Sequence, residues 1–217
     1  MINCRTFLSM FVVCGTMLYA EQAFYATCEK ITPAIKNKMK YSWKKNSPVP
    51  LEDLRYITVS HYDFDGSVAQ GEIVMHYLVA DDIIEIFKEL FNVKFPIQSM
   101  KLVDNFNASD DDSMDANNCY AHCTRFVDHT RWWSNHSFGI AIDINPIQNP
   151  CLTRGDFWPK AAKKYLDRTV SQPGMITKNS FIYNLFIKRG WVWGGECFGL
   201  SYIDYHHFQK NDPWLKR

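Results

Sequence analysis

The length, composition and charge of the chain limit the classes of protein to which it can belong. It has 217 residues, of which 47% are hydrophobic and 22% charged, as is typical of a globular protein with one compact core. The formal net charge is only +1. Because nucleic-acid binding requires a concentration of positive charge, we expect no nucleic-acid partner.

The first twenty residues have the pattern of a secretory signal peptide. Arg5 is the only charged side chain before Glu21. An apolar run over residues 7–19 follows, and the small residue Ala20 ends the segment. This run is shorter than the roughly 20 residues of a membrane-spanning helix. We therefore predict a signal peptide over residues 1–20, with an uncleaved anchor as the alternative, no other membrane segment, and export to the periplasm or cell envelope.

The cysteine count bears on this prediction. Two of the seven cysteines, Cys4 and Cys14, lie within the predicted signal peptide, and five remain. An odd number in an exported chain leaves at least one thiol unpaired within the chain. We expect one or two disulfides of unassigned pairing, and the alternative is a set of small buried side chains. The five are Cys28, Cys119, Cys123, Cys151 and Cys197.

In chain order, the predicted elements begin with a polar, lysine-rich segment. We expect residues 21–50 to form an irregular, partly helical N-terminal arm. Beta-branched and aromatic residues over 56–62, followed by a second run over 72–79, predict a β-hairpin. Residues 81–91 carry one apolar stripe at helical spacing and predict an amphipathic helix. Residues 99–104 predict another short strand.

The second half of the chain continues this alternation. Residues 109–115 predict an acidic loop, which lacks the glycine and the distal glutamate of an EF-hand calcium site. Alternating isoleucines over 140–145 predict a strand with one apolar face. Ser180 is expected to cap a helix, and residues 191–193 to form a strand. The order predicts an α+β fold with a small, largely antiparallel sheet and flanking helices, in one domain over 51–217.

Two histidines and two aspartates have spacings that suit metal chemistry. His136 precedes the strand that carries Asp143 on its polar face, so both side chains can point into one cleft. Asp204 and His207 are three residues apart and approach one point in a tight turn, one as a base and the other as a ligand. Two histidines and one aspartate around zinc leave a fourth position for water. Each pattern alone is common, so spacing indicates only a possible zinc hydrolase.

The segment from Ser134 to Asn145 resembles the S-x-H-x-x-G-x-A-x-D signature of the VanY-like D-alanyl-D-alanine carboxypeptidases. These are zinc peptidases related to lysostaphin-type enzymes and to the hedgehog signalling domain. Several ordered motifs extend the resemblance over roughly residues 50–210. They are Asp110–Met114 with Asn117-Asn118, Arg125, Pro146, Asn149-Pro150, Pro173–Ile176, Gly190–Gly195 and Asp204–Phe208.

The resemblance implies a role for each site residue. Asp204 would be the general base that activates a zinc-bound water. Arg125 would polarise the scissile carbonyl and stabilise the oxyanion, with a plain surface arginine as the alternative. Ser134 would support the site indirectly. The ligands of one zinc ion per chain would be His136, Asp143 and His207.

Other residues near the motifs carry weaker expectations. Trp133 and Trp193 either line a peptide cleft or pack in the core, and the ring of His206 is expected to face away from that of His207. The chain departs from the family pattern where Glu196-Cys197 replaces an acid followed by tryptophan. It departs again at two cysteines, Cys119 and Cys123. These changes bear on substrate preference and leave the ligand set and the base intact.

The activity implied by the resemblance is that of a zinc metallopeptidase acting on peptidoglycan stem peptides. It would be a D,D-carboxypeptidase or an endopeptidase of L-Ala-D-Glu type, and the choice between them stays open. One alternative is a non-catalytic, zinc-containing module that binds wall peptides or a protein partner. Another is a zinc hydrolase with a different substrate, such as a small dipeptide.

Overall fold

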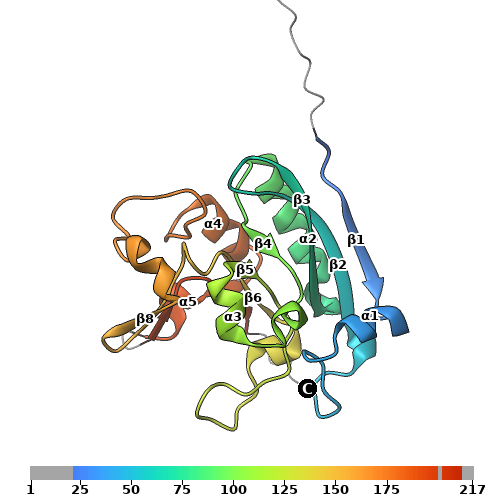
Figure 1. Cartoon of the computed structure of the whole chain (residues 1–217). Helices are drawn as coiled ribbons and strands as arrows, with labels where there is room; N and C mark the ends of the chain where they lie inside the picture. The colour runs from blue at the N-terminus through green and yellow to red at the C-terminus, as the bar shows by residue number, and fades with distance from the viewer. Residues whose placement is uncertain (1–21, 200–201, 212–217) are drawn as a thin grey trace, which may run out of the picture.

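The computed structural model describes residues 22–199 and 202–211 (Figure 1). The predicted signal peptide lies outside these residues. Among the described residues, no helix combines the length and the apolar character that crossing a membrane requires. The mixed fold of small antiparallel sheets and a few helices confirms the predicted α+β class. It differs from the prediction in that the described strands divide into several small sheets.

The first sheet is antiparallel and contains the predicted hairpin. Its second strand ends earlier than expected, because the Nδ1 atom of His76 accepts a hydrogen bond of 3.2 Å from the backbone N–H of Leu78. Because of this cap, helix α2 (Tyr77–Asn92) begins within residues 72–79, which were predicted to form a strand. In spatial order the strands are β1 (Ala26–Lys30), β2 (Leu54–Tyr62) and β3 (Val68–His76).

The segment predicted as an irregular arm contributes regular structure to this sheet. Strand β1 pairs with β2 along its whole length, with Ala26 opposite Val59. Helix α1 (Pro33–Lys38) follows, capped by the side chain of Thr32. Ile35 of this helix packs in a small apolar cluster on the sheet. A short 3-10 helix, Leu51–Asp53, then leads into β2.

Helix α2 supplies much of the main core. The amphipathic helix predicted over residues 81–91 is confirmed and is longer by a turn at its N-terminal end. Each fully buried aliphatic or aromatic side chain contributes about 1.5–3 kcal/mol to folding. The helix buries Val79, Ala80, Ile83, Ile86, Phe87, Leu90 and Phe91.

A second antiparallel sheet occupies the centre of the molecule. Ile140, Ile142 and Ile144 are fully buried in the same core as α2, which confirms a strand with one apolar face. Helix α4 (Phe181–Ile187) packs nearby and is capped as predicted by Ser180, whose side chain accepts a hydrogen bond from the Tyr183 N–H. In spatial order the strands are β6 (Ala141–Asp143), β11 (His207–Lys210) and β9 (Trp191–Trp193).

The remaining elements are short. A third antiparallel sheet has the order β10 (Tyr202–Asp204), β7 (Cys151–Thr153) and β8 (Asp156–Trp158), and β4 (Ser99–Met100) pairs in parallel with β5 (Asn118–Cys119). The described helical turns that remain are Val103–Phe106, Asn135–Phe138, Lys160–Tyr165 and α5 (Gly194–Cys197).

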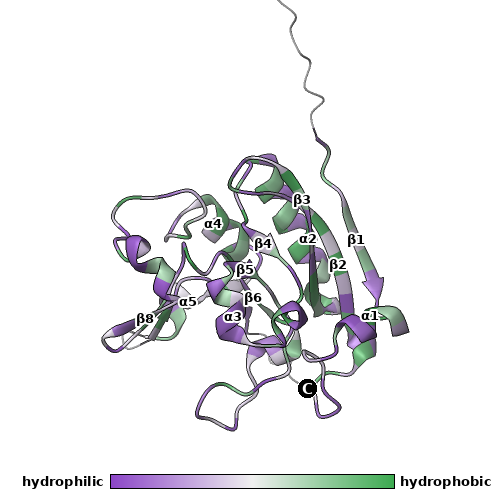
Figure 2. Ribbon diagram, viewed as in Figure 1, coloured by the Kyte–Doolittle hydropathy of each residue, from purple (hydrophilic) through white to green (hydrophobic). Residues whose placement is uncertain are grey.

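Three local predictions are wrong. The strand expected over 99–104 is cut to two residues, because a 3-10 helix begins at Val103. The acidic segment is not a loop but helix α3 (Asp110–Asp115), capped by Ser109 and hydrophilic in Figure 2. Acidic side chains at a helix N-terminus are stabilised by the helix dipole.

The third wrong prediction is that of one or two disulfides, because the five cysteines of the described chain are all unpaired. The alternative prediction, that the cysteines are small buried side chains, is confirmed for Cys119, Cys123 and Cys151.

Stability at mildly acidic pH should depend on His122. Its ring is buried, and within the described residues neither ring nitrogen has a hydrogen-bond partner. Burial, together with the charge of His136, lowers the pKa of His122 to about 3. The unfolded state therefore binds the proton more readily, and stability is lost as the pH falls below about 6.5. The loss at pH 5 is about 2 kcal/mol.

Urea unfolding at pH 7.5 and 5.0, with chelator present throughout, checks this prediction. The free energy of unfolding of His122→Leu should change less between the two pH values than that of the unmodified protein, by about 2 kcal/mol. An equal pH dependence in both proteins would show that His122 is not the titrating group.

Candidate metal centre

A tight turn positions His136. The side chain of Ser134 accepts a hydrogen bond of 3.3 Å from the His136 N–H and caps the 3-10 helix that carries it. Gly139 ends this helix with a φ of 66°, and a Cβ atom at that position would lie 2.7 Å from the backbone nitrogen of His76. Only glycine tolerates both the backbone angle and the close approach. The turn therefore holds the His136 ring inside the protein, as the supporting role predicted for Ser134 requires.

Strand pairing positions the other two predicted ligands. Asp143 on β6 lies directly opposite His207 on β11 in the antiparallel ladder. Residues directly opposite one another share a face of the sheet, so the two side chains meet. The Nδ1 atom of His207 is 2.8 Å from Oδ1 of Asp143.

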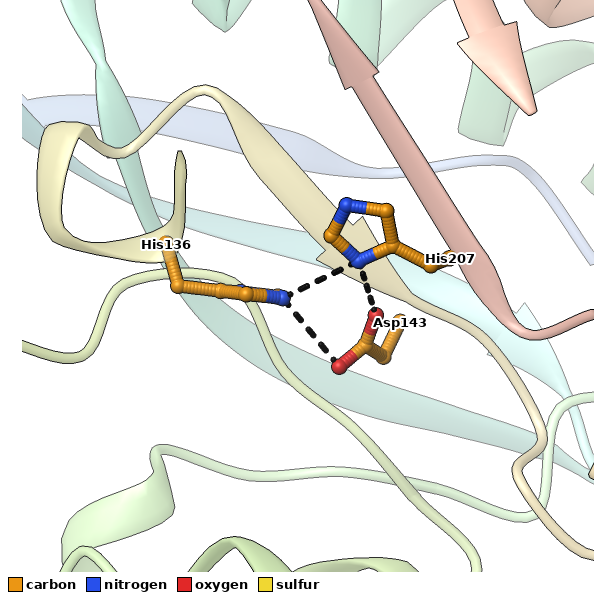
Figure 3. Close-up of side chains that lie close together, drawn as sticks. All are labelled: His136, Asp143 and His207. Atoms are coloured by element: carbon orange, nitrogen blue, oxygen red, sulfur yellow. Dashed lines mark hydrogen bonds and ion pairs between the residues drawn. The ribbon is translucent and has the colours of Figure 1, made fainter. Parts of the chain in front are cut away.

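The three side chains converge on one point, as Figure 3 shows. The Nε2 atom of His136 is 3.2 Å from Oδ2 of Asp143 and 3.2 Å from Nδ1 of His207. Ligand atoms bound to one tetrahedral zinc ion at about 2.0–2.1 Å lie about 3.3–3.4 Å apart. The spacing of these buried donor atoms therefore fits zinc. Their role as ligands stays a prediction.

Hydrogen bonds on the outer sides of both rings orient the two histidines. His136 donates from Nδ1 to the carbonyl oxygen of Ala121, and His207 donates from Nε2 to Oε1 of Gln209 over 3.0 Å. The inner nitrogens, His136 Nε2 and His207 Nδ1, therefore present lone pairs to the carboxylate when the rings are neutral. Such bonds select the tautomer and the ring direction of metal-binding histidines. A cation between the three groups relieves the repulsion of their lone pairs.

The carboxyl group of Asp143 stays ionised despite its burial. Burial alone raises its pKa, but the charges of His136 and His206 and the hydrogen bonds of the facing imidazoles outweigh burial. The pKa of Asp143 is therefore held well below its ordinary value. An ionised, buried carboxylate is the form that binds a metal cation.

Asp204, the predicted base, lies at the end of β10, three residues before the donor His207. Asp204 is buried. A Cβ atom added at Gly194 would lie 3.0 Å from the Cβ atom of Asp204 and 3.1 Å from the Cβ atom of His207. The glycine thus allows the start of α5 to pack against both residues. The hydroxyl of Tyr202 donates to Oδ2 of Asp204 over 3.4 Å.

His206 is a contact of the site that the sequence did not reveal. Its Nε2 atom is 2.8 Å from Oδ1 of Asp204 and 4.0 Å from Oδ2 of Asp143. Its Nδ1 atom donates to the backbone oxygen of Asn149 over 2.8 Å. We expected the His206 ring to face away from that of His207, but both rings approach the carboxylate of Asp143, at 4.0 and 2.8 Å. The adjacent pair His206-His207 was the only signal in the sequence for this contact.

Arg125 is joined to the centre through an aromatic ring. It donates from Nη2 to the hydroxyl of Tyr120 over 3.3 Å, and the Tyr120 ring stacks on that of His136 at 4.9 Å between centroids. Nη2 also forms an ion pair of 2.6 Å with Oδ2 of Asp110. The Arg125 side chain as a whole is partly exposed, and its Nε atom is buried. The predicted position beside the centre is therefore consistent with the structure, and the catalytic role stays a prediction.

The two tryptophans of uncertain role have different environments. Trp193 is buried in the main core, and its Nε1 donates to the backbone oxygen of Tyr205 over 2.9 Å. It therefore packs in the core. Trp133 is only partly buried and stacks on Phe126 at 4.0 Å between ring centroids.

Comparison with known protein families bears on this geometry. Residues 127–210 match the family model described as D-alanyl-D-alanine carboxypeptidase. The predicted resemblance to this family is confirmed over these residues, and the part of it predicted before residue 127 lies outside the match. The segment that matches the carboxypeptidase family contains the three donors and Asp204 and begins just beyond Arg125. The family name indicates a peptidase, which is a hydrolase. No curated protein and no solved structure matched the chain.

Zinc content tests the donor set. The purified protein should hold about one zinc ion per chain after dialysis, and His207→Ala should hold almost none because a three-donor site loses one donor. His129→Ala is the matched control, since His129 is exposed and outside the donor set. Elemental mass spectrometry measures both. Full zinc retention by His207→Ala would contradict the assignment.

Proposed function

We propose that the chain is an exported zinc metallopeptidase that hydrolyses peptide bonds of peptidoglycan stem peptides. The observation that supports this most is a buried triad of donors with a further buried carboxylate, that of Asp204, which is linked to Asp143 of the triad through the ring of His206. Export is supported by the sequence pattern of residues 1–20. The family match favours D,D-carboxypeptidase action, and cleavage within the stem is the other outcome that the same groups can produce.

The protein groups divide the work of hydrolysis. His136, Asp143 and His207 would hold zinc, which would supply Lewis-acid activation of water and of the scissile carbonyl. Asp204 takes a proton from the attacking water and returns it to the leaving amine, as general acid–base catalysis requires. A structural zinc site is normally closed by four protein ligands, whereas here three donors are linked through His206 to a further buried carboxylate, and this argues against the non-catalytic alternative.

Arg125 provides fixed positive charge near the site. Burial opposes that charge, but Tyr120 and Asp110 outweigh burial and hold the pKa of Arg125 above its ordinary value. Hydrogen bonds with Ser137 hold the backbone of Arg125 in place, because the Arg125 N–H donates to Ser137 Oγ over 2.9 Å and Ser137 Oγ donates to the Arg125 carbonyl oxygen over 2.6 Å. A held guanidinium can stabilise the negative charge that develops on the carbonyl oxygen.

Replacing the base should abolish activity and leave the metal in place. Asp204→Asn removes the proton acceptor, so kcat should fall by about 10²–10⁴-fold while zinc content is unchanged. Mass spectrometry of muropeptides incubated with the protein, with and without chelator, measures the product. Loss of a terminal alanine identifies a carboxypeptidase, and a cut within the stem identifies an endopeptidase. A variant as active as the unmodified protein would exclude Asp204 as the base.

Replacing the arginine should lower the rate more than the affinity. Arg125→Gln removes the positive charge that would stabilise the oxyanion, so kcat should fall by about 10²–10³-fold with a smaller change in KM. Arg154→Gln, at an exposed arginine in the turn after β7, is the matched control. Equal values of kcat and KM for the two variants would show that Arg125 is a surface arginine without a catalytic role.

A further inference from the structure

A β-hairpin with exposed aromatic side chains leads directly into the candidate metal centre. We call residues 125–134 the aromatic hairpin. Its two sides are joined by backbone hydrogen bonds from the Val127 N–H to the Trp132 oxygen, 2.8 Å, and from the Ser134 N–H to the Arg125 oxygen, 3.1 Å. In Figure 1 it is the yellow-green loop that projects from the lower edge of the molecule.

The hairpin exposes apolar surface that the described chain does not cover. The side chain of Trp132 is 78% exposed, and those of Phe126 and Val127 are each 45% exposed. Phe126 and Trp133 stack across the hairpin with ring planes 19° apart, which stiffens it. Clustered exposed aromatic residues on a structured element mark an interaction surface.

The hairpin is continuous with the site at both of its ends. It begins at Arg125 and ends at Ser134, the cap of the helix that carries His136. The hydroxyl of Ser137 in that helix accepts a hydrogen bond of 2.9 Å from the Arg125 N–H and donates one of 2.6 Å to the Arg125 carbonyl oxygen. The hairpin therefore joins the proposed oxyanion-stabilising residue, Arg125, to the turn that carries the predicted ligand His136.

The charge of the hairpin restricts the chemistry of its partner. Arg125 is paired with Asp110, and Arg131 is balanced by Asp128, so that His129 is the one further titratable side chain of the hairpin. A surface that binds anionic lipid needs an excess of positive charge, which this hairpin lacks. Exposed aromatic rings beside Asp128, Thr130 and Arg131 suit a neutral partner with both a flat apolar face and hydroxyl groups.

We propose that the aromatic hairpin binds a sugar ring of the glycan strand to which the stem peptide is attached, and this rests on the proposed function. The C–H face of a pyranose ring is flat and apolar and can stack on Trp132. Its hydroxyl groups can hydrogen-bond the polar side chains at the tip. The small and acidic residues of a stem peptide offer no comparable flat surface. The hairpin thus makes the enzyme prefer peptides that remain linked to sugar.

Kinetics on matched substrates test this proposal. A disaccharide-linked stem peptide and the same peptide without sugar are compared with the full-length protein, Trp132→Ala and Phe181→Ala. Phe181 is 47% exposed on α4, outside the hairpin, and serves as the control. In Trp132→Ala the ratio of kcat/KM for the linked over the free peptide should fall about tenfold, chiefly through KM. An unchanged ratio would overturn the proposal.

A binding measurement separates this proposal from the proposed function. Cosedimentation with insoluble glycan strands stripped of peptide reports on the hairpin even if no substrate is cleaved. The unmodified protein and Phe181→Ala should sediment with the strands, and Trp132→Ala should remain in solution. No sedimentation of the unmodified protein, or equal sedimentation of all three, would contradict the proposal. Sedimentation with neutral lipid vesicles in place of glycan would identify a membrane surface instead.

Discussion

The pairing of β6 with β11 is the constraint on which the candidate site depends. It places Asp143 directly opposite His207, and a slip of one residue would turn one of them to the other face of the sheet. The apolar residues between them hold the register, because Ile142 lies opposite Phe208 and both are fully buried. Phe208 in turn stacks on Phe186 of α4 at 3.9 Å between ring centroids. Apolar packing on one face thus aligns two polar groups on the other.

The electrostatics of the centre explain why such a cluster suits a metal ion. An unpaired buried carboxylate costs several kcal/mol, so Asp143 needs compensating positive charge. Protonated imidazoles around it would supply part of that charge, whereas a divalent cation between the inner nitrogens would supply it with the rings neutral. The proposed base and the proposed oxyanion-stabilising guanidinium lie on separate elements. Asp204 is on β10, and Arg125 is at the start of the aromatic hairpin. The core therefore positions a ligand set, a base and a guanidinium at one edge.

Sequence patterns predicted the parts of this architecture that depend on local periodicity and capping. The isoleucine alternation around residues 140–144, the stripe of α2 and the Ser180 cap are properties of neighbouring residues, and the structure confirms them. Tertiary contacts decided the rest. The acidic segment forms α3, whose first residue, Asp110, binds Arg125 across the fold. The contact of His206 with Asp204 depends on the turn between two strands of different sheets, which periodicity does not encode.

X-ray absorption at the zinc K-edge of the purified, zinc-loaded protein tests the central claim most directly. The account predicts two imidazole nitrogens and carboxylate oxygen at about 2.0–2.2 Å, with no sulfur. In His207→Ala only one imidazole should remain among any residual ligands. The described chain contains five unpaired cysteines, each of which could bind zinc instead. A sulfur ligand at about 2.3 Å would contradict the proposed centre.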